Sequence, residues 1–321
     1  MGPRTAHFDG RRFLNQVPAR EKRALDVLRW WWTRRPPEWP EKLPAAVPGP
    51  RPPARVREPG RLRVTFINHA TVLLQLDGVN VLTDPVYSDR VGPWSGVGPK
   101  RHRPPGIAFG DLPPIDLVLI SHNHYDHLDL PTLRRLAERH RPRILVPLGN
   151  RALLERHGIP GGEEYDWGQS ARHGHLRVTL SPSRHWSGRG LADRSRTLWA
   201  AYVVQGSAGA VYFAGDTGWG PHFAEARRRF GPFRLALLPI GSYEPRWFMA
   251  DSHLSPEEAL RAHLALGAAT SVAIHFGTFR LSDENWDDPP RALAAALAKH
   301  RVPRSRFWVL EGGEARELLA R

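Results

Sequence analysis

The sequence predicts a layered α/β sandwich, with sheets at the centre and helices outside, preceded by an N-terminal helical and Pro-rich arm. Three observations support this prediction. Short apolar runs alternate with helical patterns through most of the 321 residues. Several runs are too uniformly apolar for half-exposed strands. Nine prolines among residues 36–59 argue against regular structure there. We therefore expect an arm at 1–61 and one main domain at 62–321.

The composition excludes several classes of protein. Hydrophobic residues make up 41% of the chain, enough for a sizeable core, yet no stretch approaches the roughly 18 apolar residues of a membrane span. The chain has no cysteine, which excludes disulfides, thiolate metal ligands and a cysteine nucleophile. Its net charge is +14, but residues 1–63 hold 15 Lys or Arg against 6 Asp or Glu. Because the main domain is therefore only mildly basic, we do not expect a nucleic-acid partner.

The arm contains an amphipathic helix, predicted at residues 22–34. At 100° per residue, one side collects apolar residues and the other charged or polar ones. The apolar side consists of Ala24, Leu25, Val27, Leu28, Trp31 and Trp32, and the opposite side of Lys22, Arg23, Asp26, Arg29, Thr33 and Arg34. The apolar stripe has two possible partners. It can dock on the main domain, with 36–59 as its strap, or it can lie in a lipid interface.

The first residues resemble the start of a twin-arginine export signal, at Arg11-Arg12-Phe13-Leu14. The apolar run that such a signal requires does not follow, because Pro18 and the charged residues 20–23 occupy its place. We therefore expect a cytoplasmic protein, with peripheral membrane contact through the arm as the alternative.

The main domain begins with two predicted strands, Leu62–Leu76 and Val79–Thr83, joined at Asp77-Gly78, a dipeptide typical of a tight hairpin turn. Strands and helices then mix. Further strands are predicted at 116–120, 143–147, 175–181, 199–204, 210–214, 234–240, 271–275 and 307–310, and helices at 131–140, 150–157, 221–230, 256–266 and 290–300. Asp129 and Ser255 are the expected helix N-caps.

A dense group of potential metal ligands follows the strand predicted at 116–120. The sequence Ser121-His122-Asn123-His124-Tyr125-Asp126-His127 presents an H-x-H-x-D-H cluster. In extended geometry His122, His124 and Asp126 would point the same way, and a turn at Asp126-His127 can direct the last two toward a second point. One loop can thus serve two metals.

Three further candidates each close an apolar run: His185, Asp216 and His275. We expect all seven residues to converge at one sheet edge. Without cysteine, such a His and Asp set suits zinc, and iron or manganese are also allowed. Asp216 lies in a Gly-rich stretch, 215–220, which lacks the Lys-Ser/Thr of a phosphate loop. We expect its glycines to let the backbone approach the metals.

Longer strings carry a family resemblance over residues 62–312. They are Leu82-Thr83-Asp84-Pro85, Gly98-Pro99-Lys100-Arg101, Pro113-Pro114-Ile115-Asp116, Phe213-Ala214-Gly215-Asp216-Thr217-Gly218, and Pro239-Ile240-Gly241 leading to Tyr243-Glu244-Pro245-Arg246-Trp247-Phe248-Met249. With them the chain resembles the metallo-β-lactamase-fold hydrolases, and within these the branch of N-acyl-phosphatidylethanolamine-hydrolysing phospholipase D.

The resemblance implies an αββα sandwich with a two-metal site, most simply two Zn²⁺. It places His122, His124 and His185 on one metal, Asp126, His127 and His275 on the other, and Asp216 between them as a bridge. Asp126 and Asp216 would then belong to the catalytic set. His253 is the one further histidine that we expect near the phosphoryl group. For His69 we expect a packing role.

The function that follows is a phospholipase D-type phosphodiesterase. A hydroxide bridging the metals would attack phosphorus, releasing N-acylethanolamine and phosphatidic acid from N-acyl-phosphatidylethanolamine or a related phospholipid. The same fold also supports two alternative activities, that of a lactonase and that of an RNA-processing phosphodiesterase. A non-enzymatic binding protein, in which metals only hold loops together, is the alternative of a different class.

Overall fold

The computed structural model describes residues 5–20, 22, 24–44, 50–94, 96–190 and 192–319. Arg23 and the side chain of Ala24, both part of the predicted amphipathic pattern, lie outside this description, as do residues 45–49 of the Pro-rich segment. None of the helices in the described ranges combines the length and the apolar character that a membrane crossing requires.

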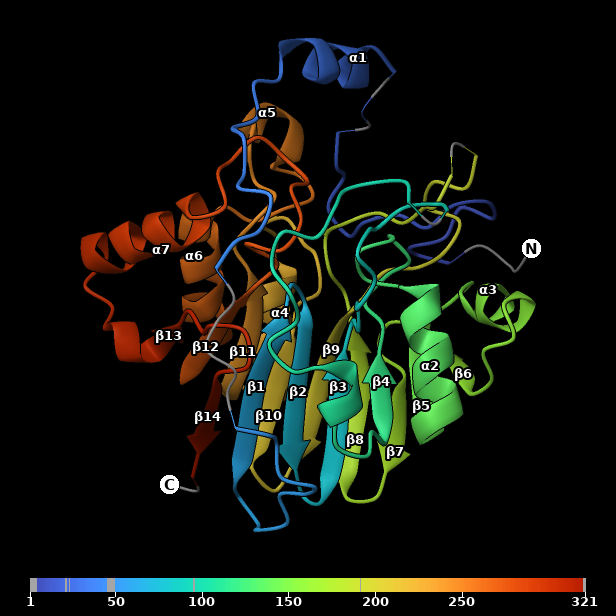
Figure 1. The fold of residues 1–321 in the computed structure, drawn as a ribbon, viewed down its shortest axis with the longest axis vertical. Coiled ribbons are helices and arrows are strands. Elements are labelled where there is room, and N and C mark those ends of the chain that lie inside the picture. The colour runs from blue at the N-terminus through green and yellow to red at the C-terminus, as the bar shows by residue number, and fades with distance from the viewer. Residues whose placement is uncertain are drawn as a thin grey trace.

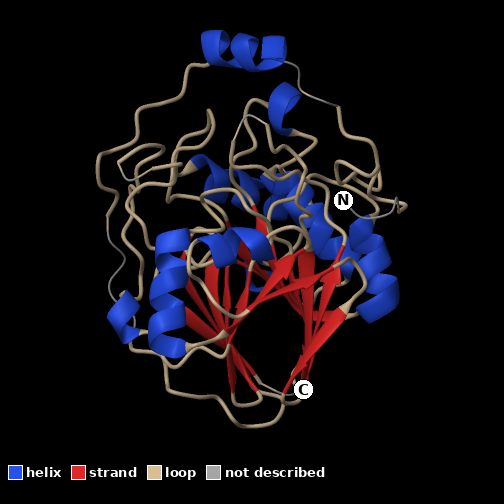
Figure 2. Ribbon diagram, turned by 90° about the vertical axis from the view of Figure 1, so that its right-hand side faces the viewer, coloured by secondary structure: helices blue, strands red, loops and turns tan. Residues whose placement is uncertain are grey.

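Two seven-stranded sheets face each other, and helices cover their outer sides (Figures 1 and 2). The first sheet has the order β14-β1-β2-β3-β4-β5-β6 and the second β13-β12-β11-β10-β9-β8-β7. The strands of the first sheet are β1 (Leu62–Asn68), β2 (Thr71–Leu76), β3 (Val79–Thr83), β4 (Leu117–Leu119), β5 (Arg143–Pro147), β6 (Gly162–Tyr165) and β14 (Ala315–Leu318). Those of the second are β7 (Ser170–His173), β8 (Leu176–Ser181), β9 (Ala201–Gly206), β10 (Gly209–Phe213), β11 (Phe233–Pro239), β12 (Thr270–Ile274) and β13 (Phe307–Trp308).

The helices are α1 (Ala24–Thr33), α2 (Leu130–His140), α3 (Arg151–Arg156), α4 (His222–Phe230), α5 (Arg246–Met249), α6 (Pro256–Leu266) and α7 (Asp288–Lys299). Most of the helices supply the outer layers of the predicted sandwich, whereas α1 and α5 lie at one end of it (Figure 1). The buried residues of α2, such as Leu133 and Leu136, pack with Ile67, Leu82 and Val118 of the first sheet. A larger cluster fills the space between the sheets and extends under α4, α6 and α7. The predicted αββα sandwich is confirmed.

Two local predictions need correction. The strand expected over Leu62–Leu76 is interrupted at His69, whose φ of 46° turns the chain, so that β1 and β2 pair as an antiparallel hairpin. Asp129 precedes α2 but makes no capping hydrogen bond to that helix. Its carboxylate instead accepts from the backbone N–H groups of Tyr87 and Ser88, at 3.2 and 3.1 Å. Ser255 does cap α6, in a reciprocal capping box with Glu258.

The N-terminal segment packs along the main domain. Phe13 is buried beside Leu198 and Trp199. Residues 36–44 and 50–59 contain no helix or strand, as their prolines predicted. Leu43 is nevertheless buried, and its N–H donates to the carbonyl of His102 at 2.7 Å. Residues 36–44, which follow α1, therefore run along the surface of the domain.

Candidate metal centre

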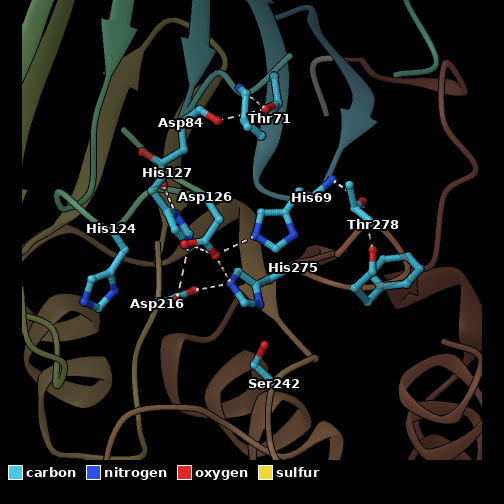
Figure 3. A network of polar contacts seen from close by, with 12 residues as sticks. His69, Thr71, Asp84, His124, Asp126, His127, Asp216, Ser242, His275 and Thr278 are labelled. Carbon is cyan, nitrogen blue, oxygen red and sulfur yellow. Dashed lines mark hydrogen bonds and ion pairs between the residues drawn. The ribbon is translucent and has the colours of Figure 1, made fainter. Parts of the chain in front are cut away.

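The predicted ligands follow strands that end at one side of the sandwich. His122 lies just beyond β4, Asp216 beyond β10 and His275 beyond β12, while His185 lies a few residues beyond β8. Neighbouring strands β10, β11 and β12 are parallel, as are β3, β4 and β5, so their carboxyl ends meet at the same edges. The seven residues predicted from the sequence are brought together there. Figure 3 shows five of them: His124, Asp126, His127, Asp216 and His275.

The H-x-H-x-D-H loop divides its side chains between two groups. The loop turns from His124 onward, earlier than the predicted turn at Asp126-His127. The N–H of His127 donates to the carbonyl of His124 at 3.1 Å. The ring nitrogens of His122 and His124 face each other at 2.7 Å, and His185 Nε2 lies 3.3 Å from His124 Nδ1. Asp126 Oδ2 instead lies 3.3 Å from His275 Nε2 and 3.3 Å from His127 Nε2.

Asp216 lies between the two groups. Its Oδ2 is 3.8 Å from His185 Nε2 and 3.3 Å from His127 Nε2, and its Oδ1 is 3.2 Å from His275 Nε2. A Gly-rich turn makes this position possible. Gly215 has a φ of 58°, and a Cβ there would lie 2.4 Å from the Cβ of Ser121. Glycine is therefore required at this position on both counts, because the backbone passes close to Ser121; the expected approach to the metals stays a prediction.

The chemistry of these donors fits metal cations. His127 Nε2, His275 Nε2 and Asp216 Oδ1 are buried and have no hydrogen-bond partner. Burial lowers the pKa of His124 to about 4, so its ring is neutral and can act as a ligand. Against the opposing effect of burial, the charge of Asp216 raises the pKa of His275 to about 9. The carboxylates of Asp126 and Asp216 thus favour positive charge at the position of the His275 ring, as a site for a metal cation requires.

Two buried groups that the sequence did not assign orient these ligands. Asp84, at the end of β3, lies with its Oδ2 2.6 Å from His127 Nδ1 and accepts from the Ser121 hydroxyl at 2.5 Å. Ser121 Oγ is in turn 2.9 Å from His122 Nδ1. This arrangement leaves the Nε2 atoms of both histidines free for a metal. Like the ligands, Asp84 follows an apolar strand, and that signal could have found it.

His69 takes part in the site as well as packing in the core. Its Nε2 lies 3.0 Å from Asp126 Oδ2, and its ring centroid is 4.1 Å from that of His275. The expected packing role therefore describes only part of its environment. His69 belongs to one group of potential ligands with Asp126, His127 and His275. The turn between β1 and β2 brings His69 to this group, because the carbonyl of His69 accepts from the N–H of His275 at 2.7 Å.

A pocket of about 900 Å³ opens onto these residues. Its polar lining comes from His124, Asp126, Asp216, His253 and His275, together with Arg189 and Ser242. Its remaining walls are largely apolar or aromatic, from Val91, Pro93, Trp94, Pro99, Tyr125, Trp186, Met249 and Leu281. His253 lines this pocket, with its Nδ1 3.8 Å from Asp216 Oδ2, and its expected place near a phosphoryl group stays a prediction.

Comparison with known proteins agrees with this geometry. The profile of a family described as "Beta-lactamase superfamily domain" matches residues 79–276. The chain belongs to the metallo-β-lactamase superfamily. It is a metal-dependent hydrolase by family, and its residues 69–275 contain the ligand cluster that such an enzyme requires.

Individual members of the superfamily are similar over most of this chain. An uncharacterised Mycobacterium tuberculosis protein is 46% identical over 262 residues, covering 80% of this chain and 70% of its own. N-acyl-phosphatidylethanolamine-hydrolyzing phospholipase D 1 of Caenorhabditis elegans is 38% identical over 267 residues, 79% of this chain and 75% of its own. A solved metallo hydrolase from the archaeon Ignicoccus hospitalis shares the fold, with a TM-score of 0.62 at 20% identity over 81% of this chain and 100% of its own.

Proposed function

We propose that this metal-dependent hydrolase is a phospholipase D-type phosphodiesterase acting on N-acyl-phosphatidylethanolamine or a related phospholipid. The observation that carries the proposal is the position of Asp216, between two groups of ligand atoms at the polar end of an apolar-walled pocket. The C. elegans relative, whose name states hydrolysis of N-acyl-phosphatidylethanolamine, supports the same substrate class.

In this proposal His122, His124 and His185 hold one metal ion, Asp126, His127 and His275 hold the second, and Asp216 contacts both. Two zinc ions bound there would activate water and stabilise negative charge at a reacting phosphoryl group. With neutral histidines, these ligands contribute two negative charges from Asp126 and Asp216. Two divalent ions would therefore leave a net positive site, which favours an anionic phosphodiester over a neutral lactone.

The pocket walls suit a lipid. Trp94, Trp186, Met249 and Leu281 offer apolar surface next to the charged part of the site, as binding of an amphiphilic substrate requires. A small hydrophilic phosphodiester would leave this surface in contact with water. The walls thus favour a phospholipid over the RNA strand that the sequence also left open.

His253 would contact the phosphoryl group. Burial lowers the pKa of His253 to about 3, so its ring is neutral at physiological pH and offers one N–H donor. Its Nδ1 is buried without a hydrogen-bond partner and lies near Asp216 in the pocket lining. A donor in this place can hydrogen-bond to a phosphoryl oxygen as its charge grows.

Hydrolysis in water enriched in the heavy oxygen isotope tests the proposal. A new oxygen–phosphorus bond forms and the bond from phosphorus to the N-acylethanolamine oxygen breaks, so we expect the label in phosphatidic acid. The released alcohol, which takes up a proton, should be unlabelled. Label in a fatty carboxylate would instead show acyl hydrolysis. Turnover of a lactone, without turnover of either a lipid or a soluble phosphodiester, would also contradict the proposal.

A further inference from the structure

Among its described side chains, helix α1 contacts the main domain mainly through Trp30. The ring of Trp30 stacks on that of Phe248 with a centroid distance of 4.9 Å, and its Nε1 donates to Asp283 Oδ2 at 3.0 Å. Arg34 Nε lies 3.4 Å from the same carboxylate, and Lys22 Nζ lies 4.2 Å from the centre of the Phe248 ring. Trp30, rather than the apolar stripe, is therefore the side chain by which this helix docks.

The apolar stripe faces solvent. Leu25, Leu28, Trp31 and Trp32 are 75%, 58%, 65% and 78% exposed. This finding corrects the alternative in which the stripe docks on the main domain. At about 100° per residue, Leu25, Leu28 and Trp32 lie on the side of the helix away from Trp30, and Trp31 lies between the two sides. Four large apolar side chains exposed together on one short helix are typical of a contact surface.

This surface adjoins the mouth of the metal-site pocket. The short helix α5 connects them, because Phe248 contacts α1 while its neighbour Met249 lines the pocket. Trp247 is 40% exposed and lies under the guanidinium of Arg29, at 4.8 Å. Trp94, on the pocket wall, is 74% exposed. Both views place α1 and α5 at the end of the molecule that carries the loops of the site (Figures 1 and 2).

The charge around the stripe identifies its partner. Arg29 and Arg35 are exposed around the helix, Arg20 is exposed and pairs with Asp26 at 2.8 Å, and residues 20–35 hold six basic side chains against two acidic ones. A second copy of this chain would bring the same excess of positive charge against itself. An anionic lipid surface would instead complement it, since tryptophans prefer the interface and each arginine near such a surface contributes about 1 kcal/mol of attraction.

We propose that α1, together with Trp247 and Trp94, forms a lipid-contacting surface that places the pocket mouth against an anionic membrane. The helix docks through Trp30 and inserts Leu25, Leu28, Trp31 and Trp32 among lipid headgroups. The proposal extends the proposed function by stating how the enzyme meets an aggregated substrate. It does not depend on which bond the enzyme breaks.

Vesicle binding by the full-length, metal-loaded protein tests the proposal. We compare wild type with the double variant Trp31→Ser/Trp32→Ser, and use Leu264→Ser/Leu319→Ser as the matched control, because Leu264 and Leu319 are also exposed but lie on other elements. Wild type and control should co-sediment with vesicles of phosphatidylcholine and phosphatidylglycerol, and the tryptophan variant should bind about tenfold more weakly or worse. Salt should weaken wild-type binding.

A soluble phosphodiester separates this inference from the proposed function. The tryptophan variant should turn it over at the wild-type rate, because neither residue lines the pocket. If wild type binds the vesicles as expected but hydrolyses no phosphodiester, the proposed function fails and the lipid surface stands. Equal vesicle binding by wild type and the tryptophan variant overturns the lipid surface. The lipid surface is also overturned if the wild type forms a dimer, the tryptophan variant does not, and both bind vesicles equally. Leu25→Ser/Leu28→Ser provides a second variant should the first be unstable.

Discussion

The side-chain amide of Asn15 forms two hydrogen bonds with the main chain of His185. Its Nδ2 donates to the carbonyl at 2.9 Å, and its Oδ1 accepts from the backbone N–H at 3.0 Å. The indole N–H of Trp199 donates to the same Oδ1 at 3.2 Å. On the other side, His185 Nδ1 donates to the carbonyl of Ser252 at 2.9 Å. The N-terminal segment therefore helps to hold a residue of the candidate metal centre.

Replacing Asn15 by Ala should weaken one metal site more than the other. The substitution removes both hydrogen bonds to His185, and loss of groups that orient ligands typically costs ten- to a hundredfold in metal affinity. We expect about tenfold weaker binding at the site that includes His122 and His124, measured by competition with a chelator. Gln16→Ala, which removes a neighbouring exposed side chain, is the control and should bind as wild type. Unchanged affinity in Asn15→Ala would contradict this role.

Asp216→Asn should remove most activity and weaken both metal sites. A neutral amide bridges two cations poorly, and it no longer balances the charge around His127 and His275. We expect turnover to fall about a hundredfold or more, together with a lower metal content per chain by elemental analysis. Asp77→Asn is a useful comparison, because Asp77 lies on the β2–β3 turn, where its carboxylate accepts from the backbone N–H of Ser207. An Asp216→Asn variant that keeps two metals and near-normal turnover would refute the bridging assignment.

His253→Ala should lower turnover while leaving the metals in place. In the proposed function the ring supplies a hydrogen bond to the phosphoryl group and no ligand. We expect kcat to fall by about ten- to a hundredfold, within the range for one lost donor to a developing charge, with the metal content unchanged. His253→Gln, which keeps an N–H donor, should retain more activity. Equal loss of metal and activity would make His253 a ligand instead.

His263 should make the folded protein less stable in acid. It is fully buried on α6, with Nδ1 2.8 Å from Ser271 Oγ, and burial lowers the pKa of His263 to about 4. In the unfolded chain it binds a proton below about pH 6.5. Stability is therefore lost as pH falls from about 6.5 toward about 4, by about 2 kcal/mol between pH 7 and pH 5. Urea unfolding at the two pH values should show a correspondingly smaller difference for His263→Gln. An identical difference would mean that His263 contributes no acid sensitivity.

Much of the site could be predicted because its residues occupy positions with a local signature. The H-x-H-x-D-H cluster is contained in one loop, and Asp216 and His275 each follow an apolar strand. In a layered α/β fold the carboxyl ends of neighbouring parallel strands lie at the same edge of the sheet. A residue that directly follows such a strand is therefore expected at that edge. The absence of cysteine restricts the donors to nitrogen and oxygen. The ligand residues and the sandwich fold could thus be predicted from the sequence alone.

Only the tertiary structure decided the contacts that join distant segments. Asn15 and His185 are 170 residues apart, and nothing near either residue encodes their meeting. His69 reaches Asp126 because the chain turns at positive φ, where the apolar pattern continued without a break. The periodicity of α1 identified an apolar stripe but not its partner, since Trp30 lies outside that stripe and makes the contact. The local sequence pattern indicates which side chains lie on the same face of a helix or strand. The path of the whole chain determines which other residues that face contacts.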